Sequence, residues 1–252
     1  MRKKLTIIIF TLCILLPEKM TAACPIDSIQ LKARAGYSIG GTAPLGLPAT
    51  IRSLDAYRLT PSFMVGVDVQ LPFQKNWGLL TGLHFENKGM DADITTKGYH
   101  MEMVKGESRL DGLFTGHIKQ EVTSWMLTLP IQATYTISDK VMLKGGPYVS
   151  YLLNKDFSGI ASEGYLREGD PTGAKIVMGD KEGEWATYDF SDKMRNLQFG
   201  VGVGIDWQPW SAIGFSADLN WGLNGIFNSD FKTVEQTLYP IYGTVSVFYR
   251  IR

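Results

Sequence analysis

Cysteine is scarce in this sequence, and no apolar run is long enough for a transmembrane helix. The chain has 252 residues and two cysteines, Cys13 and Cys24. Its longest apolar run covers residues 5–16, whereas a membrane-spanning helix needs about 17 to 25 residues. Histidine is also rare, and 25 basic residues balance 25 acidic ones. This balance, without a basic cluster, predicts no nucleic-acid partner.

Residues 1–23 predict a secretory signal peptide. Three basic residues precede the apolar run, and small residues end the segment at a cleavage site: Arg2, Lys3, Lys4, and then Thr21, Ala22, Ala23. Cleavage after Ala23 would leave residues 24–252 with a formal charge of −3 and one cysteine. An exported chain of this size without a disulfide must gain its stability from a large core or from a membrane.

Cys24 leaves two alternatives open. A cysteine directly after a small-residue triplet can be the lipidated first residue of a lipoprotein. Thr21 and the polar Glu18 and Lys19 fit that signal poorly. The other alternative is ordinary cleavage, with an idle thiol near the new terminus.

Eight stretches alternate a large apolar side chain with glycine or a polar group, which is typical of strands. They are residues 31–39, 63–71, 77–86, 123–135, 141–153, 196–209, 213–221 and 239–251. Short turns join the second stretch to the third, the fourth to the fifth and the sixth to the seventh, and long polar segments make the other connections. A membrane barrel sorts its connections in this way, with short periplasmic turns and longer extracellular loops. The pattern predicts an all-β, eight-stranded antiparallel up-and-down transmembrane barrel with four long extracellular loops and both termini in the periplasm.

The apolar face of each stretch is predicted to face lipid, and the glycine and polar face a narrow lumen. Aromatic residues at the ends of the stretches predict two interfacial girdles. These residues are Tyr37, Phe63, Trp77, Phe85, Trp125, Tyr135, Trp207, Trp210, Trp221, Tyr239 and Tyr249.

The segment LTLPIQATYTISDKVMLKGGPYVSYLLN, residues 127–154, resembles the porin-T-like outer-membrane β-barrel family of Bacteroidetes. The similarity lies in Leu127, Leu129 and Pro130 at one strand and in Gly145, Gly146, Pro147 and Tyr148 at the next. The resemblance implies a barrel in a Gram-negative outer membrane, inserted by the barrel-assembly machinery. One branch of that family is similar to a component of a gliding and secretion system, which implies a role as a secretion accessory. The chain ends in Arg250, Ile251, Arg252 rather than in the usual terminal aromatic residue.

The predicted lumen contains four groups of each charge: Lys32, Arg34, Asp68, Glu86, Lys144, Asp206, Asp218 and Arg250. Buried charges are costly unless they are paired, so the balance favours a salt-bridge network that plugs the barrel over a proton or ion pathway. A plugged lumen also disfavours a passive pore.

Candidate sites for chemistry are few, and no catalytic, cofactor or metal residue is predicted. His84 is expected to point inward beside Glu86, while His100 and His117 lie in the second long connection without a catalytic motif. The stretch DADITTKGYHME spaces Asp91, Asp93, Thr95 and Glu102 like calcium ligands, but Thr96 replaces the required glycine. The sequence predicts a solvated loop there. The GVGVG of residues 200–204 is not followed by a helix, so it is no dinucleotide fingerprint.

The third long connection, residues 154–193, is rich in acids and contains Trp185 and Tyr188. Two interpretations stay open for it: a surface that contacts a protein partner or lipopolysaccharide through bridging cations, and a mobile hydrated loop that shields the barrel. The sequence therefore predicts a non-enzymatic outer-membrane protein with a structural or surface-interaction role. The alternatives are the secretion accessory and, less favoured, a lipid-modifying enzyme.

Overall fold

The computed structural model describes residues 29–44, 48–231, 233–234 and 237–251. The predicted signal peptide and Cys24 lie outside these residues, so both remain predictions. Within the described part of the chain, no helix is long and apolar enough to cross a membrane.

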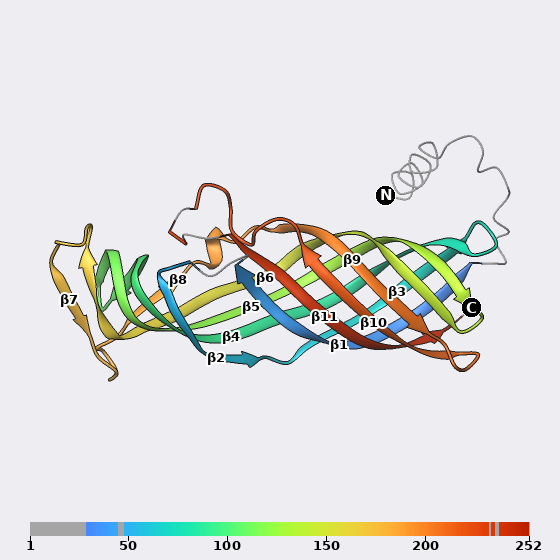
Figure 1. The fold of residues 1–252 in the computed structure, drawn as a ribbon, viewed down its shortest axis with the longest axis horizontal. Helices are drawn as coiled ribbons and strands as arrows, with labels where there is room; N and C mark the ends of the chain where they lie inside the picture. The colour runs from blue at the N-terminus through green and yellow to red at the C-terminus, as the bar shows by residue number, and fades with distance from the viewer. Residues whose placement is uncertain (1–28, 45–47, 232, 235–236, 252) are drawn as a thin grey trace.

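Eight antiparallel strands form a closed ring (Figure 1). In the order β3, β1, β11, β10, β9, β6, β5, β4, each strand pairs with the next, and β4 closes the ring by pairing with β3. The strands are β1 (Gln30–Pro44), β3 (Ser62–Pro72), β4 (Trp77–Lys105), β5 (Ser108–Ser138), β6 (Val141–Glu168), β9 (Leu197–Trp207), β10 (Ile213–Gly222) and β11 (Leu238–Arg250). The predicted eight-stranded antiparallel barrel is confirmed.

Three short connections lie together at one end of the ring, which we call the turn end. They are residues 73–76, 139–140 and 208–212. The first and last strands also meet there, because Lys32 of β1 pairs with Arg250 of β11. The chain therefore enters and leaves the barrel at the turn end, and the long connections lie at the opposite end.

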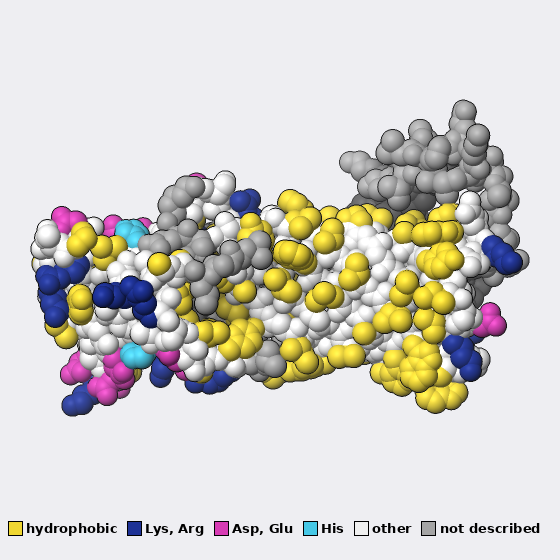
Figure 2. Space-filling view, in the orientation of Figure 1, with side chains coloured by type: hydrophobic (Ala, Val, Ile, Leu, Met, Phe, Trp, Pro, Cys, Tyr) yellow, Lys and Arg dark blue, Asp and Glu magenta, His cyan; other side chains and the backbone are white. Residues whose placement is uncertain are grey.

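The alternation in β9 shows which side of the sheet faces outward. Val201, Val203 and Ile205 are exposed, whereas Gly202 and Asp206 of the other face are buried. Apolar side chains cover the outside of the barrel in the same way on the face that Figure 2 shows. Because closure satisfies the backbone groups within the ring, this apolar exterior suits a lipid surrounding.

The second and third long connections correct one prediction, because most of their residues are strand rather than polar loop. β4 and β5 continue as one hairpin as far as a tight turn at Gly106 and Glu107, and β6 continues to Glu168. These distal parts of β4, β5 and β6 (residues 88–105, 108–124 and 154–168) project beyond the barrel (Figure 1). Together with β2 (Ile51–Leu59), β7 (Lys175–Met178), β8 (Ala186–Asp189) and η3 (Ser191–Lys193) they form what we call the extension.

The extension has its own closed ring and its own core. β8 pairs with β6 at Ser158–Ala161 and with β4 at Val104, so that β4, β5, β6 and β8 enclose one another. The enclosed side chains are apolar and rich in methionine and aromatic rings, and they include Met101, Met103, Phe114, Phe157, Met178 and Phe190. The third long connection contributes Phe157, Ala161, Leu166, Met178, Ala186, Tyr188 and Phe190 to this packed core, whereas most of residues 167–185 are exposed. The segment is therefore not a hydrated loop throughout, and its mobility and its contacts stay predictions. The sequence alone did not indicate this core, because acidic residues on the opposite face dominate the composition.

Candidate functional site

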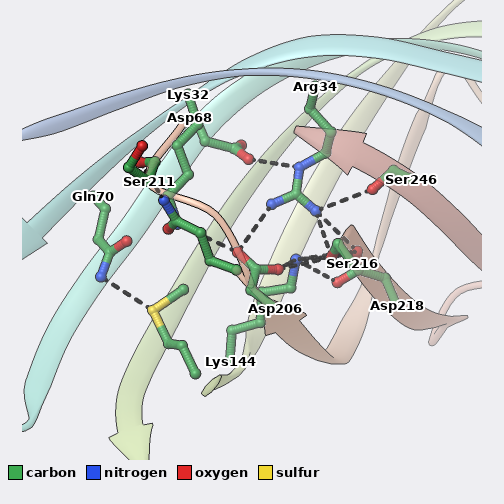
Figure 3. Close-up of polar contacts among 12 residues, drawn as sticks. Lys32, Arg34, Asp68, Gln70, Lys144, Asp206, Ser211, Ser216, Asp218 and Ser246 are labelled. Carbon is green, nitrogen blue, oxygen red and sulfur yellow. Dashed lines mark hydrogen bonds and ion pairs between the residues drawn. The ribbon is translucent and has the colours of Figure 1, made fainter. Parts of the chain in front are cut away.

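Most of the predicted interior charges converge in the barrel lumen (Figure 3). Lys32, Arg34, Asp68, Glu86, Lys144 and Asp206 are buried, and the Asp218 side chain is 11% exposed. Arg250 is different: it is half-buried at the turn end, beside Gln30 and Lys32. Within the described residues Arg250 makes no ion pair, so it does not join the network.

Arg34 is the central cation of the network. Its Nε lies 2.8 Å from Asp68, and its two terminal nitrogens lie 3.1 Å from Asp218 and 3.5 Å from Asp206. β1, β3, β9 and β10 supply these four side chains, so the guanidinium connects strands across the lumen. A planar group with five donors can bind three carboxylates at once in a way that a lysine cannot.

Lys144 of β6 completes the pairing from the opposite wall. Its Nζ lies 2.8 Å from one oxygen of Asp206 and 2.8 Å from one oxygen of Asp218. The Ser216 hydroxyl sits among these groups, 2.8 Å from Lys144 Nζ and 2.7 Å from Asp206 Oδ1. Lys32 lies 3.4 Å from Asp206. With Lys32 included, three cations face three carboxylates in the middle of the barrel.

A second cluster on β4 joins the first through a histidine. His84 Nε2 lies 2.7 Å from Asp68, and its Nδ1 lies 3.8 Å from Glu86. Glu86 in turn lies 2.7 Å from Lys88. Lys88 was not predicted because the predicted strand ended at residue 86, although Lys88 continues the alternation of His84 and Glu86.

The network leaves little free volume in the lumen. The cavity bounded by Arg34, Asp68, His84, Lys144 and neighbouring side chains measures about 30 Å³, which is room for about one or two water molecules. Both ring nitrogens of His84 face carboxylates rather than a hydroxyl nucleophile. Chemically, the arrangement is suited to bracing the strands against one another.

The aromatic residues lie at two levels of the barrel. Trp77, Tyr135, Trp207, Trp210 and Tyr249 lie near the turn end, and Tyr37, Phe63, Phe85, Trp125, Trp221 and Tyr239 lie near the extension. Ring pairs hold each level: Trp77 contacts Tyr135 with centroids 4.9 Å apart, and Trp125 lies 5.2 Å from Phe85. Their role as interfacial anchors stays a prediction.

The segment that resembles a calcium loop is strand, which corrects the prediction of a solvated loop. Asp91, Asp93 and Thr95 are part of β4, where they pair across the hairpin with Glu121, Lys119 and His117. An extended strand cannot wrap its ligands around an ion as a loop does. Among the described residues, no group of three or more histidine, cysteine or acidic side chains is arranged to hold a metal ion.

The two remaining histidines make outward contacts on the extension. His100 Nε2 lies 3.0 Å from Asp111. His117 lies between Asp55 and Glu163, at 3.6 and 3.7 Å. Asp55 also accepts hydrogen bonds from the Ser53 and Thr95 hydroxyls, and these bonds hold its pKa below the ordinary value of an aspartate.

A charged groove of about 580 Å³ lies on the extension. β2, β4, β5, β6 and β8 all contribute to it, and its charged lining residues are Arg58, Asp91, Asp93, Lys119, Glu121 and Asp189. Arg58 is bound to Asp93 at 2.7 Å. Figure 2 shows charged side chains gathered on the extension, whereas the barrel face beside it is apolar.

A closed barrel with an apolar exterior, a charged interior and two aromatic levels defines a class, the β-barrel proteins of Gram-negative outer membranes. The outer membrane protein beta-barrel domain family matches residues 22–228. The chain belongs to this family and to the outer membrane. The match is to the family as a whole, so the resemblance to the porin-T-like branch stays a prediction.

Several solved outer-membrane barrels are similar in fold. Ail, the attachment invasion locus protein of Yersinia pestis, is 12% identical, with 88% of this chain and 99% of that chain covered and a TM-score of 0.40. OprG from Pseudomonas aeruginosa is 10% identical, with 88% and 96% covered and a TM-score of 0.33. The outer membrane protease OmpT from Escherichia coli is 12% identical, with 92% and 99% covered and a TM-score of 0.36. At these scores the similarities carry no inference about function. No curated protein matches the sequence.

Proposed function

We propose that this protein is a non-enzymatic outer-membrane barrel that contacts a partner outside the cell through its extension. The proposal rests on the continuation of β4, β5 and β6 beyond the barrel as a closed ring with its own apolar core. A loop that only shields a barrel needs no such core. A packed extension holds its surface in one shape, which lowers the entropy cost of binding.

The charged groove is the surface best suited to this contact. Lys119 and Glu121 of β5 are exposed in it beside Asp189 of β8. Charged groups of both signs favour a polar partner of complementary charge, such as an envelope or extracellular protein. Lipopolysaccharide bound through bridging cations is the second partner of this chemistry.

The orientation is tested first, with two lysines as a matched pair. Lys119 lies on the extension, and Lys140 is exposed at the turn end. In chains that lack other cysteines, a membrane-impermeant maleimide should label Lys119→Cys on intact cells and Lys140→Cys only after the outer membrane is opened. The reverse pattern would place the extension in the periplasm and contradict the proposal.

The contact is tested at the same two positions with a photo-crosslinking amino acid. Irradiation of intact cells should give a discrete protein adduct, or a chelator-sensitive lipopolysaccharide adduct, from position 119 but not from position 140. Arg58→Glu should weaken the adduct several-fold, because it reverses a groove charge. The proposal fails if position 119, although labelled on intact cells, gives no adduct.

The secretion alternative is separated by comparing the surface and secreted proteomes of a deletion strain with those of its parent. Loss of a defined set of exported proteins would support an accessory role in secretion. An unchanged proteome would support the contact role. The lipid-modifying alternative predicts altered lipid A or phospholipid after His84→Gln, whereas the contact role predicts no change.

A further inference from the structure

A second cavity lies where the barrel meets the extension, beyond the charge network. It measures about 160 Å³, and its walls come from the ends of β1 and β11 and from β2, β4, β5, β6 and β8. The lining is mainly apolar and includes Ile51, Leu54, Met90, Met101, Ile118 and Phe190. Cavities with such linings stay dry and accept apolar ligands.

The barrel wall is interrupted beside this cavity. β1 pairs with β3 only as far as Ser38 and Ser62, and β2, which continues from β3, pairs with β4 and not with β1. The edge of β1 beyond Ser38 therefore has no ladder partner on that side within the described residues. As a result, the Thr42 backbone N–H donates to the Met90 sulfur at 3.1 Å, a weak acceptor.

Among the described residues, one hydrogen bond bridges the two strands at this interruption. The Tyr57 hydroxyl of β2 donates to the Gly40 carbonyl of β1 at 2.6 Å. Ile39, Leu54 and Tyr57 are exposed around it. A single bond from a side chain opens more easily than a strand ladder, so the interruption offers an apolar route between the outside of the wall and the cavity.

The size and the apolar lining of the cavity define the ligand. An engineered apolar cavity of about 150 Å³ binds benzene, so a cavity of about 160 Å³ admits a single six-membered ring and excludes a whole lipid. Tyr188 lines the cavity, but its hydroxyl has almost no accessible surface and lies against Gly159, which is not part of the lining. A ligand in the cavity therefore meets apolar walls and needs no polar substituent.

We propose that this cavity is a binding site for a small apolar aromatic molecule of benzene size, which enters between β1 and β2. The cavity shares Gln120 and Tyr188 with the lining of the charged groove, but the proposal does not depend on the proposed contact role.

Methyl-labelled methionine reports on this site from within the protein. Met90 and Met101 line the cavity, whereas Met64 and Met142 lie in the barrel, near the charge network and near the turn end. In lipid nanodiscs, benzene should shift the Met90 and Met101 methyl resonances with saturation and leave the other two in place. Shifts that rise without saturation, or that affect all four methyls equally, would show partition into lipid and overturn the proposal.

Two variants separate binding in the cavity from other effects. Ala92→Phe fills the cavity from its β4 wall and should abolish the shifts, whereas Ala217→Phe on the lipid-facing side of β10 should not. Resonances that depend on lipid chain length and resist benzene would assign the cavity to an acyl chain and overturn the proposal.

Discussion

At the scale of single residues, glycine makes room for the charge network. Gly204 of β9 lies between Asp218 of β10 and Lys144 of β6 in the sheet. A side chain at position 204 would collide with the Asp218 carboxylate and lie 2.7 Å from Lys144 Cε. Gly204 therefore leaves room for two charged side chains, and Gly202 in the same way leaves room for Asn220 and Gln132.

The network predicts that the loss of a buried cation, Lys144, lowers the free energy of unfolding more than the loss of Arg250 at the turn end. Lys144→Met removes a close cation that Asp206 and Asp218 share. We therefore expect the free energy of unfolding to fall by about 3 to 5 kcal/mol. Arg250→Met removes a charge at the turn end and should change that free energy by less than about 0.5 kcal/mol. The measurement is the folded fraction against urea concentration, read from gel mobility. Equal effects of the two variants would mean that water solvates the lumen charges.

At the scale of elements, the same strand type serves two surroundings. Val203 of β9 and Val177 of β7 are exposed valines, 58% and 62%, but the first lies midway along the barrel and the second on the extension. A sheet in water would tolerate a charge at either position. A barrel in lipid would tolerate a charge only at position 177, because the extension projects beyond the barrel.

Arginine at these two positions tests where the membrane lies. Val203→Arg should cost about 2 to 4 kcal/mol of folding free energy in a bilayer, as expected near the midplane. Val177→Arg should stay within about 0.5 kcal/mol of the parent. Refolding into lipid vesicles across a urea series measures both, and a tolerated arginine at position 203 would contradict a lipid-facing β9.

β2 is expected to loosen in acid. Because hydrogen bonds lower the pKa of Asp55 in the folded protein, its contribution is present above the ordinary pKa of about 3.9. That contribution is lost as the pH falls through the lower, folded value. Amide hydrogen exchange in β2 should therefore speed up below about pH 4, and Asp55→Asn should remove this pH dependence. If exchange in β2 responds to acid equally in both proteins, another group is responsible.

At the scale of the whole molecule, one experiment tests whether the barrel is closed and another tests whether its lumen is blocked. A closed barrel should migrate differently before and after boiling, whereas an open sheet should not. The network in the lumen predicts that the purified protein shows no stable conductance in planar bilayers, because the cavity among its charges measures only about 30 Å³. Regular conductance steps would show an aqueous path and contradict the plugged lumen.

The sequence by itself determined the barrel, because alternation with period two in eight stretches specifies one apolar and one polar face for each strand. It also indicated the inward charges, since their position in the alternation fixes their side of the sheet. Arg34 and Asp68 could be assigned in this way before any contact was known.

The tertiary structure alone decided the extension, the charged groove and the apolar cavity. In the extension, the inward residues of β4 alternate with Asp91 and Asp93, and the acidic face obscured the apolar one in the composition. The gap between β1 and β2 depends on where the ladder of β1 and β3 stops, and such a long-range register leaves no local signal. Pairing partners and enclosed volume belong to the folded chain, because segments far apart in the sequence create them together.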